Sequence, residues 1–312
     1  MGKGNETAPN SFILLGLFSD SKYPGILISI ILVIYVIAVT GNSILILLIW
    51  LDSQLHIPMY VLLSQLSLMD LTLTTSTITK MAIDFFSGKR YISQVGCGTQ
   101  MFFYLTVGIA ECVFLKLMAY DRYVAICNPL RYPVLMSPRV CLMMVIISWG
   151  RSAFTSLSHT SYIMHFPTCG SREIHHFFCE VMAFLKLSCE DTSIYEKVVL
   201  VTGTVLLLIP FGLILASYAL IFLTVLRMNS LKGRNKALVT CSSHLTVVSL
   251  YFGPIMIIYI TPCSSLTLEL NQHLFVFDTV ITPLLNPFIY SLRNKEVMKA
   301  LKMVLSISLM SK

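Results

Sequence analysis

Seven long apolar stretches, separated by short polar segments, constrain this chain more than any other feature of its sequence. A helix needs about 20 mainly apolar residues to cross a membrane, and each stretch reaches that length. The chain is 56% hydrophobic and only 12% charged, whereas a soluble domain carries roughly 25% charged residues. The sequence therefore predicts an all-α membrane protein, a bundle of seven transmembrane helices.

The stretches also divide the 312 residues into regions. The predicted spans are Gly25–Trp50, Pro58–Ile78, Gly96–Ile126, Val140–Ile163, Val198–Leu226, Ala237–Ile260 and His273–Leu292. We expect a tail at residues 1–24, a bundle at residues 25–292 with one long loop at residues 164–197, and a C-terminal segment at residues 293–312. In that last segment Val297, Leu301, Val304 and Leu305 fall on one helical face, which predicts a short amphipathic helix lying on membrane lipid.

The basic residues indicate how the bundle is oriented. On one side lie Arg122, Arg131, Arg139, Arg227, Lys232, Arg234, Lys236, Arg293, Lys295, Lys299, Lys302 and Lys312, with few acids. Loops rich in Lys and Arg stay in the cytoplasm, so we expect an extracellular N-terminus and a cytoplasmic C-terminus. The glycosylation sequon Asn5-Glu6-Thr7 lies in the expected outer tail. The net charge of +7 is spread over short patches, which argues against nucleic acid as a partner.

Four cysteines fall at the outer end of the third span and in the long loop: Cys97, Cys169, Cys179 and Cys189. On that side of the membrane they are expected to form disulfides, and three pairings are possible. The neighbouring His175, His176 and Glu180 look like part of a metal cluster. Solvated loop histidines are the favoured interpretation, because a cysteine in a disulfide cannot bind metal as a thiolate.

Several polar residues lie inside the apolar spans, where a charge costs about 2.5–3.5 kcal/mol on insertion scales. Asp70 and Glu111 are carboxyl groups within the second and third spans, and the pair Asp121-Arg122 ends the third. In the seventh span Pro287 follows Asn286, and proline removes a helical hydrogen bond and kinks its helix. Charged groups at this depth are functional-site candidates by default.

Three sequence motifs resemble those of a known family. Met118–Cys127 reads MAYDRYVAIC, Lys236–Leu245 reads KALVTCSSHL, and Pro283–Lys295 reads PLLNPFIYSLRNK. The chain resembles the olfactory receptors, a branch of the rhodopsin-like (class A) G-protein-coupled receptors, and is most similar to their tetrapod-type (class II) family 2. The matching motifs are distributed over nearly the whole chain.

The resemblance implies a function and its partners. We expect an odorant receptor of the plasma membrane that binds small, volatile, mostly hydrophobic ligands. Its signalling partner would be a heterotrimeric stimulatory olfactory-type G protein that raises cAMP. The implied disulfides are Cys97–Cys179 and Cys169–Cys189. The implied ligand-binding residues are Tyr104, Leu105, Gly108, Ile109, Thr202, Leu206, Ile255, Met256 and Tyr259.

The resemblance also implies a switch near the cytoplasmic side. Its residues would be Asp121, Arg122, Tyr123, Tyr218, Asn286, Pro287 and Tyr290. At rest Asp121 would hold Arg122, which activation releases. Asp70, Glu111 and Asn286 would meet in the bundle centre, where they suit a hydrated Na⁺ ion; a shared proton or a water-bridged network are the alternatives. No other cofactor is expected.

Some residues depart from the family pattern. Lys116, Arg151 and Asp278 are charged at places where the family often has apolar or aromatic residues, and Tyr251-Phe252 stands where Phe-Tyr is commoner. The sequence contains no nucleophile–base constellation and no phosphate loop, so an enzyme is not expected. A transporter using the intramembrane acids as a proton relay would show internal repeats, and the sequence has none.

Overall fold

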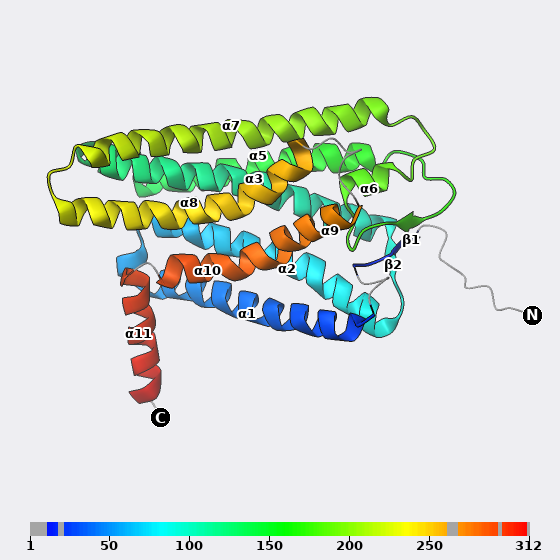
Figure 1. The fold of residues 1–312 in the computed structure, drawn as a ribbon, viewed down its shortest axis with the longest axis horizontal. Helices are drawn as coiled ribbons and strands as arrows, with labels where there is room; N and C mark the ends of the chain where they lie inside the picture. The colour runs from blue at the N-terminus through cyan, green and yellow to red at the C-terminus, as the bar shows by residue number, and fades with distance from the viewer. Residues whose placement is uncertain (1–10, 18–21, 261–267, 293–294, 311–312) are drawn as a thin grey trace, which may run out of the picture.

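The computed structural model describes residues 11–17, 22–260, 268–292 and 295–310 and shows a bundle of long helices. The long elements are α1 (Pro24–Leu51), α2 (Pro58–Ser87), α3 (Gln94–Cys127), α5 (Pro138–Ile163), α7 (Ser193–Leu226), α8 (Leu231–Ile260), and a last helix built from α9 (Leu268–Val276), η3 (Phe277–Ile281) and α10 (Thr282–Leu292). Figure 1 shows these elements running side by side along the long axis of the molecule. The seven-helix architecture predicted from hydropathy is confirmed.

Six of the seven helices are long and apolar enough to cross a membrane by length and composition, within the described part of the chain. The seventh, α2, falls short because it carries several serines and threonines along its length and Lys80 and Asp84 in its second half. These polar groups are compatible with a spanning helix because they are bonded locally. Thr74 and Thr77 donate to carbonyls one turn earlier, and Lys80 pairs with Asp84.

Several helices extend beyond the predicted spans. Helix α7 begins at Ser193 rather than Val198, α8 at Leu231 rather than Ala237, and α2 ends at Ser87 rather than Ile78. Hydropathy marks the apolar part of a helix, whereas its ends are set by capping residues. At the end of α2, for example, Gly88 adopts φ 65°, a left-handed conformation in which glycine avoids the strain of a Cβ atom.

Short elements connect the long helices. At one end of the bundle are β1 (Ser11–Leu14), β2 (Tyr91–Ser93), β3 (Glu173–Ile174) and α6 (Val181–Leu185). At the opposite end are the single turns η1 (Ser53–Leu55), η2 (Pro129–Arg131) and α4 (Tyr132–Leu135), together with α11 (Lys295–Met310). We refer to these as the sheet end and the α11 end (Figure 1).

A three-stranded sheet at the sheet end was not expected from the sequence. Its order is β2-β1-β3, with β1 antiparallel to β2 and parallel to β3. Phe12 and Leu14 point from β1 into a buried apolar cluster with Phe184 of α6. The N-terminal segment is therefore an integral part of the fold from Ser11 onward.

Two disulfides fix the long loop. One joins Cys97 at the start of α3 to Cys179, with a Cα–Cα distance of 5.4 Å, and the other joins Cys169 to Cys189. These are the two pairs that the family resemblance implies. Cys112, Cys127, Cys141 and Cys241 are free thiols in the spans. Cys263 and Asn5 lie outside the described residues.

The contact between α1 and α10 shows how Pro287 is accommodated inside α10. Pro287 has no N–H to donate to the carbonyl of Pro283, and the side chain of Asn42 supplies the missing donor at 2.9 Å. A Cβ atom on Gly41 would lie 3.1 Å from Cγ of Pro287, so glycine allows α1 to approach the proline ring. This pair of residues ties α10 to the first helix.

Helix α11 lies across the bundle axis in Figure 1. Val297 and Ala300 are buried against the bundle, whereas Lys299 and Lys302 are exposed. This distribution confirms the predicted amphipathic C-terminal helix. The side chains of Val304 and Leu305 are outside the described residues.

Candidate functional site

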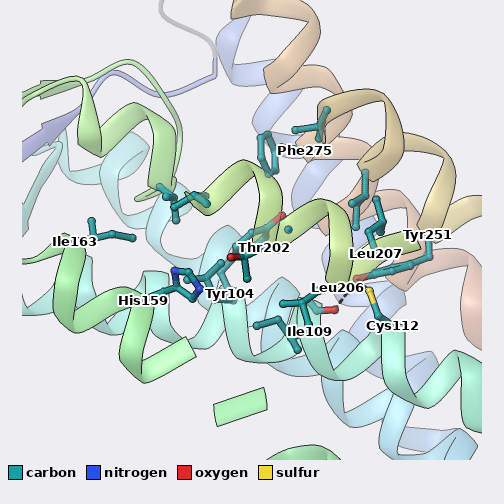
Figure 2. Close-up of a pocket in the computed structure, with 17 residues that line it drawn as sticks. Tyr104, Ile109, Cys112, His159, Ile163, Thr202, Leu206, Leu207, Tyr251 and Phe275 are labelled. Carbon is teal, nitrogen blue, oxygen red and sulfur yellow. Dashed lines mark hydrogen bonds between the residues drawn. The ribbon is translucent and has the colours of Figure 1, made fainter. Parts of the chain in front are cut away.

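A cavity of ≈ 100 Å³ lies inside the bundle towards its sheet end. Figure 2 shows its wall, to which α3, α5, α6, α7, α8 and α9 all contribute. The lining residues are Tyr104, Leu105, Gly108, Ile109, Cys112, His159, Ile163, Val181, Val199, Thr202, Gly203, Leu206, Leu207, Tyr251, Ile255, Ile258 and Phe275. The wall is mostly apolar with a few hydroxyl, thiol and imidazole groups. An engineered apolar cavity of about 150 Å³ takes benzene, so this cavity suits a ligand of few heavy atoms.

Seven of the nine residues implied by the family resemblance line this cavity: Tyr104, Leu105, Gly108, Ile109, Thr202, Leu206 and Ile255. Met256 does not line it and packs against the neighbouring apolar core instead. On α8 the lining positions are Tyr251, Ile255 and Ile258, which share one face at helical spacing, and Met256 is turned roughly 100° away from Ile255. Tyr259 lies outside the residues whose side chains the structure describes.

Other lining residues were missed, although helical periodicity points to some of them. Cys112 continues the α3 face one turn beyond Gly108, and Leu207 follows Leu206 on α7. His159, Ile163 and Val181 come from α5 and α6, which the sequence did not assign to the cavity. The inverted pair Tyr251-Phe252 was the available signal for α8, and Tyr251 is the member that faces the cavity.

Polar contacts that involve α3, α8 and η3 gather along one side of the cavity. The hydroxyl of Tyr251 donates to the carbonyl of Gly108 at 2.6 Å and contacts Sγ of Cys112 at 3.2 Å. Figure 2 shows Tyr251 and Cys112 pointing toward one another. The hydroxyl of Tyr104 donates to Oδ2 of Asp278 at 3.5 Å. We call Tyr104, Cys112 and Tyr251 the polar side of the cavity.

A polar core lies beyond the polar side of the cavity. Asp70 accepts hydrogen bonds from Nδ2 of Asn286 at 3.1 Å on each oxygen. Glu111 is 3% exposed, and its Oε1 has no hydrogen-bond partner, as is also true of Oδ1 of Asn286. The charges of Asp70 and Asp278 both act on Glu111, so the structure brings the three carboxyl groups into one electrostatic neighbourhood.

The bundle buries carboxyl groups but no lysine or arginine among the described residues. Among the described residues, the buried carboxyl groups are Asp70, Asp84, Glu111, Asp121 and Asp278, and no lysine or arginine is buried to the same degree. No group of three His, Cys, Asp or Glu side chains in the described residues has the spacing of a metal site. Two buried oxygens, one on Glu111 and one on Asn286, have no hydrogen-bond donor. Carboxylate and amide oxygens of this kind are suitable ligands for a Na⁺ ion.

The switch residues lie at the α11 end. Asp121 is 1% exposed and accepts a hydrogen bond from Tyr132 of α4 at 2.8 Å. Asp121 and Arg122 do not form a direct ion pair, although the charge of Arg122 acts on Asp121. Adjacent residues on a helix point in different directions, which explains why Asp121 binds a neighbouring element instead of Arg122.

Arg122 faces a cluster of aromatic groups. The hydroxyl of Tyr218 contacts Nδ1 of His244 at 2.6 Å, and the charge of Arg122 acts on both residues and on Tyr290. The Tyr290 hydroxyl is buried without a hydrogen-bond partner. Tyr123 is half-buried and packs against the same core. The sequence did not single out His244 as a contact of Tyr218, although it lies in the Cys-Ser-Ser-His motif.

Besides Asp278, two charged residues depart from the family pattern, Lys116 and Arg151, and they lie near each other. Lys116 on α3 is half-buried, Arg151 on α5 is exposed, and their like charges act on each other. Neither belongs to an ion pair in the described part of the chain.

His176 sits in an aromatic enclosure next to the cavity. It is 1% exposed and packs on Phe177, Phe178 and Phe275, with ring centroids 4.5 to 5.0 Å away. Neither ring nitrogen has a hydrogen-bond partner. The expectation of a solvated histidine is therefore wrong for His176, whereas its neighbour His175 is exposed. Burial lowers the pKa of His176 to about 3.

This burial makes the loop sensitive to acid. Because the folded-state pKa of His176 lies below its ordinary value of 6.5, the unfolded chain binds more protons between these values, and the free energy of unfolding falls as the pH drops below 6.5. At pH 5.5 the expected loss is about 1.4 kcal/mol. Replacing His176 by phenylalanine should remove this loss, as measured by thermal unfolding at pH 7.5 and pH 5.5.

The matched control for that experiment is His175→Phe, which should leave the pH dependence as it is. Glu180, whose pKa is raised by burial, contributes with the opposite sign, but it is present in all three proteins and cancels in the comparison. An unchanged pH dependence in His176→Phe would contradict the assignment.

Comparisons with known proteins agree with the motifs. A family model described as olfactory receptor matches residues 31–307. The chain is 50% identical over 301 residues to human Olfactory receptor 2AG2, covering 96% of this chain and 95% of that protein. It is 51% identical over 305 residues to human Olfactory receptor 2AE1, with 98% and 94% covered, and 51% identical over 303 residues to human Olfactory receptor 2T5, with 97% and 96% covered.

Proposed function

The chain belongs to the olfactory receptor family, and on that basis we propose that it binds small, volatile, mostly hydrophobic odorants and activates a stimulatory olfactory-type G protein. As a member of this family it is a multi-pass membrane protein and an odorant receptor, not an enzyme. What the proposal adds is the binding site, the partner and the direction of signalling.

The observation that carries the proposal is the mainly apolar cavity inside the bundle, next to the polar core. A cavity of this kind binds a neutral apolar body and orients it with a few polar groups. Its polar side reaches the polar core through the contact of Tyr104 with Asp278. A ligand that displaces the side chain of Tyr104 or Tyr251 therefore also displaces the polar core, which lies between the cavity and the α11 end.

The route continues along the last helix. Asp70 holds Asn286, Pro287 follows directly, and Tyr290 lies one turn further in the aromatic cluster at Arg122. A ligand that binds an open bundle better than a closed one shifts the population toward the open form. We propose that this opening exposes Arg122 to the G protein and that the G protein then raises cAMP.

The proposed orientation follows the distribution of Lys and Arg. The receptor would lie in the plasma membrane. Its sheet end, with the two disulfides, would be extracellular, and its α11 end would be cytoplasmic. Asn5 would be glycosylated. Asp70, Glu111 and Asn286 would hold a Na⁺ ion in the closed form, with a shared proton as the alternative.

The test is a screen of volatile compounds in cells that carry the receptor, an olfactory-type G protein and a cAMP reporter. We expect a concentration-dependent rise in cAMP with at least one class of small odorant, and none in cells lacking the receptor. A parallel reporter for calcium identifies coupling to another class of G protein. A response confined to calcium, at proven surface display, would overturn the proposed partner.

A further inference from the structure

Lys116 and Arg151 are two positive charges within spanning helices that have no counter-charge. Lys116 of α3 is half-buried, Arg151 of α5 is exposed, and the charge of Arg151 acts on Lys116. Neither side chain has a hydrogen-bond or ion-pair partner among the described residues, and neither lines the cavity. A charged residue in a spanning helix ordinarily pairs with another group or faces a water-filled space, so these two cations lack the partner that their position requires.

Arg151 lies on the outer face of α5. The apolar residues one turn before and one turn after it, Ile147 and Phe154, are both exposed. The opposite face of the helix carries the small side chains of Ser148 and Ser152, which are buried in the bundle. A partner for Arg151 therefore has to approach from outside the bundle, within the membrane.

The depth of Arg151 argues against a lipid head group as that partner. Arg151 stands halfway along α5, about 18–20 Å from either end at 1.5 Å per residue. Because the hydrocarbon core of a bilayer is about 30 Å thick, this position is close to the middle of the membrane. Long basic side chains reach the head groups from positions near helix ends, and Arg151 is far from both ends of its helix.

A second copy of this chain offers no suitable acid either. Among the described residues, the carboxyl groups in the middle of the spans are Asp70, Glu111 and Asp278. Each is at most 4% exposed, because each is directed into the bundle. None of them can reach Arg151 on the outer face of another copy, so the missing negative charge has to come from a different molecule.

From this arrangement we propose that Lys116 and Arg151 form a docking site for a transmembrane helix of another membrane protein, one that carries an aspartate or glutamate in the middle of its span. Opposite charges attract strongly in a medium of low dielectric constant, and arginine binds a carboxylate through two parallel hydrogen bonds. Gly150, beside Arg151, is exposed, and a Cβ atom there would meet nothing within 4 Å. A second helix can therefore come close to the α5 backbone next to the charge.

The experiment uses the full chain in phosphatidylcholine vesicles and three synthetic spanning peptides of leucine and alanine, with glutamate, glutamine or leucine at the centre. Association is measured by energy transfer from a fluorophore on the peptide to one on the C-terminus of the receptor. We expect the glutamate peptide to associate at least about tenfold more tightly than the leucine peptide, the scale of a strong polar contact between spanning helices. The glutamine peptide, which forms hydrogen bonds but carries no charge, should be intermediate.

Variants of the receptor locate the site. The double variant Lys116→Leu, Arg151→Leu should reduce the association of the glutamate peptide to that of the leucine peptide. It should also fold, because it replaces two unpaired charges by apolar side chains that suit a spanning helix. The matched control is Arg139→Leu, which removes an exposed charge at the start of the same helix and should keep the full preference for glutamate.

The outcomes distinguish the possible occupants. Equal association of the three peptides with the unmodified receptor, or a preference for glutamate that persists in the double variant, overturns the proposal. Loss of the preference when phosphatidylserine is added to the vesicles would assign the two cations to an anionic lipid head group. Energy transfer between two labelled copies of the receptor that disappears in the double variant would assign this face to self-association. Either of these last two results also overturns the proposed partner.

Discussion

Removing the Cys97–Cys179 disulfide should leave little folded protein. The bond closes a loop of 82 residues, and in the chain-entropy model a loop of this size stabilises the fold by about 4–5 kcal/mol. That is a large part of the 5–15 kcal/mol by which a typical domain is stable. We expect the double variant Cys97→Ser, Cys179→Ser to lose most of its surface display, measured by antibody labelling of intact cells against total protein.

The second disulfide provides the matched comparison. Cys169 and Cys189 are only 20 residues apart, so their bond should contribute less, about 3 kcal/mol in the same model. The variant Cys169→Ser, Cys189→Ser should therefore keep a larger share of its surface display. Cys127→Ser, which removes a free thiol, controls for cysteine replacement in general. Equal losses in both disulfide variants would contradict the loop-length argument.

Replacing Arg122 by alanine should abolish the odorant response while the protein still folds. Asp121 loses the nearby charge of Arg122 but keeps its hydrogen bond to Tyr132, so we expect the variant to fold. The proposed G-protein contact, by contrast, loses its charge. We expect the cAMP response to an active odorant to fall by at least about 100-fold, the effect of losing a buried charged contact.

The control for this variant is Arg139→Ala, at the start of α5. Arg139 is exposed at the same end of the bundle, so its removal changes the local charge equally without touching the aromatic cluster. Both variants are compared at matched surface display. A full response from Arg122→Ala would remove Arg122 from the coupling mechanism, and an equal loss in Arg139→Ala would point to overall charge instead of position.

The sequence was sufficient for the parts of the structure that depend on apolar length and helical period. Runs of apolar residues located all seven helices, and Tyr104 with Gly108, or Thr202 with Leu206, share helix faces at a spacing visible in the sequence. The asparagine that substitutes for the donor missing at Pro287 could not be found this way. Asn42 and Pro283 are 241 positions apart, and only packing of α1 on α10 brings them together.

Other errors have specific physical reasons. The strands β2 and β3 have three and two residues, too short for an alternating pattern to stand out. Tyr132, the hydrogen-bond partner of Asp121, was missed because it comes from a different element. His176 was assigned to solvent because a loop is usually solvated, but the three phenylalanines around it form a small apolar core of their own. For the strands and for Asp121 the deciding contact joins different elements, and for His176 the enclosure is completed by Phe275 from α9.

The central position of β1 in the sheet has a consequence for the order of folding. Ser11 is among the first described residues, yet its strand pairs with Ser93 and with the strand at Glu173. During synthesis β1 can pair with β2 early, but its pairing with β3 must wait until more than half of the chain has been made, and pairings between distant segments form slowly. Val181 and Ile163 belong both to the apolar cluster under this sheet and to the cavity wall. The sheet end of the cavity can therefore be assembled before α7, α8 and α9, which follow it in the chain and complete the sides of the cavity.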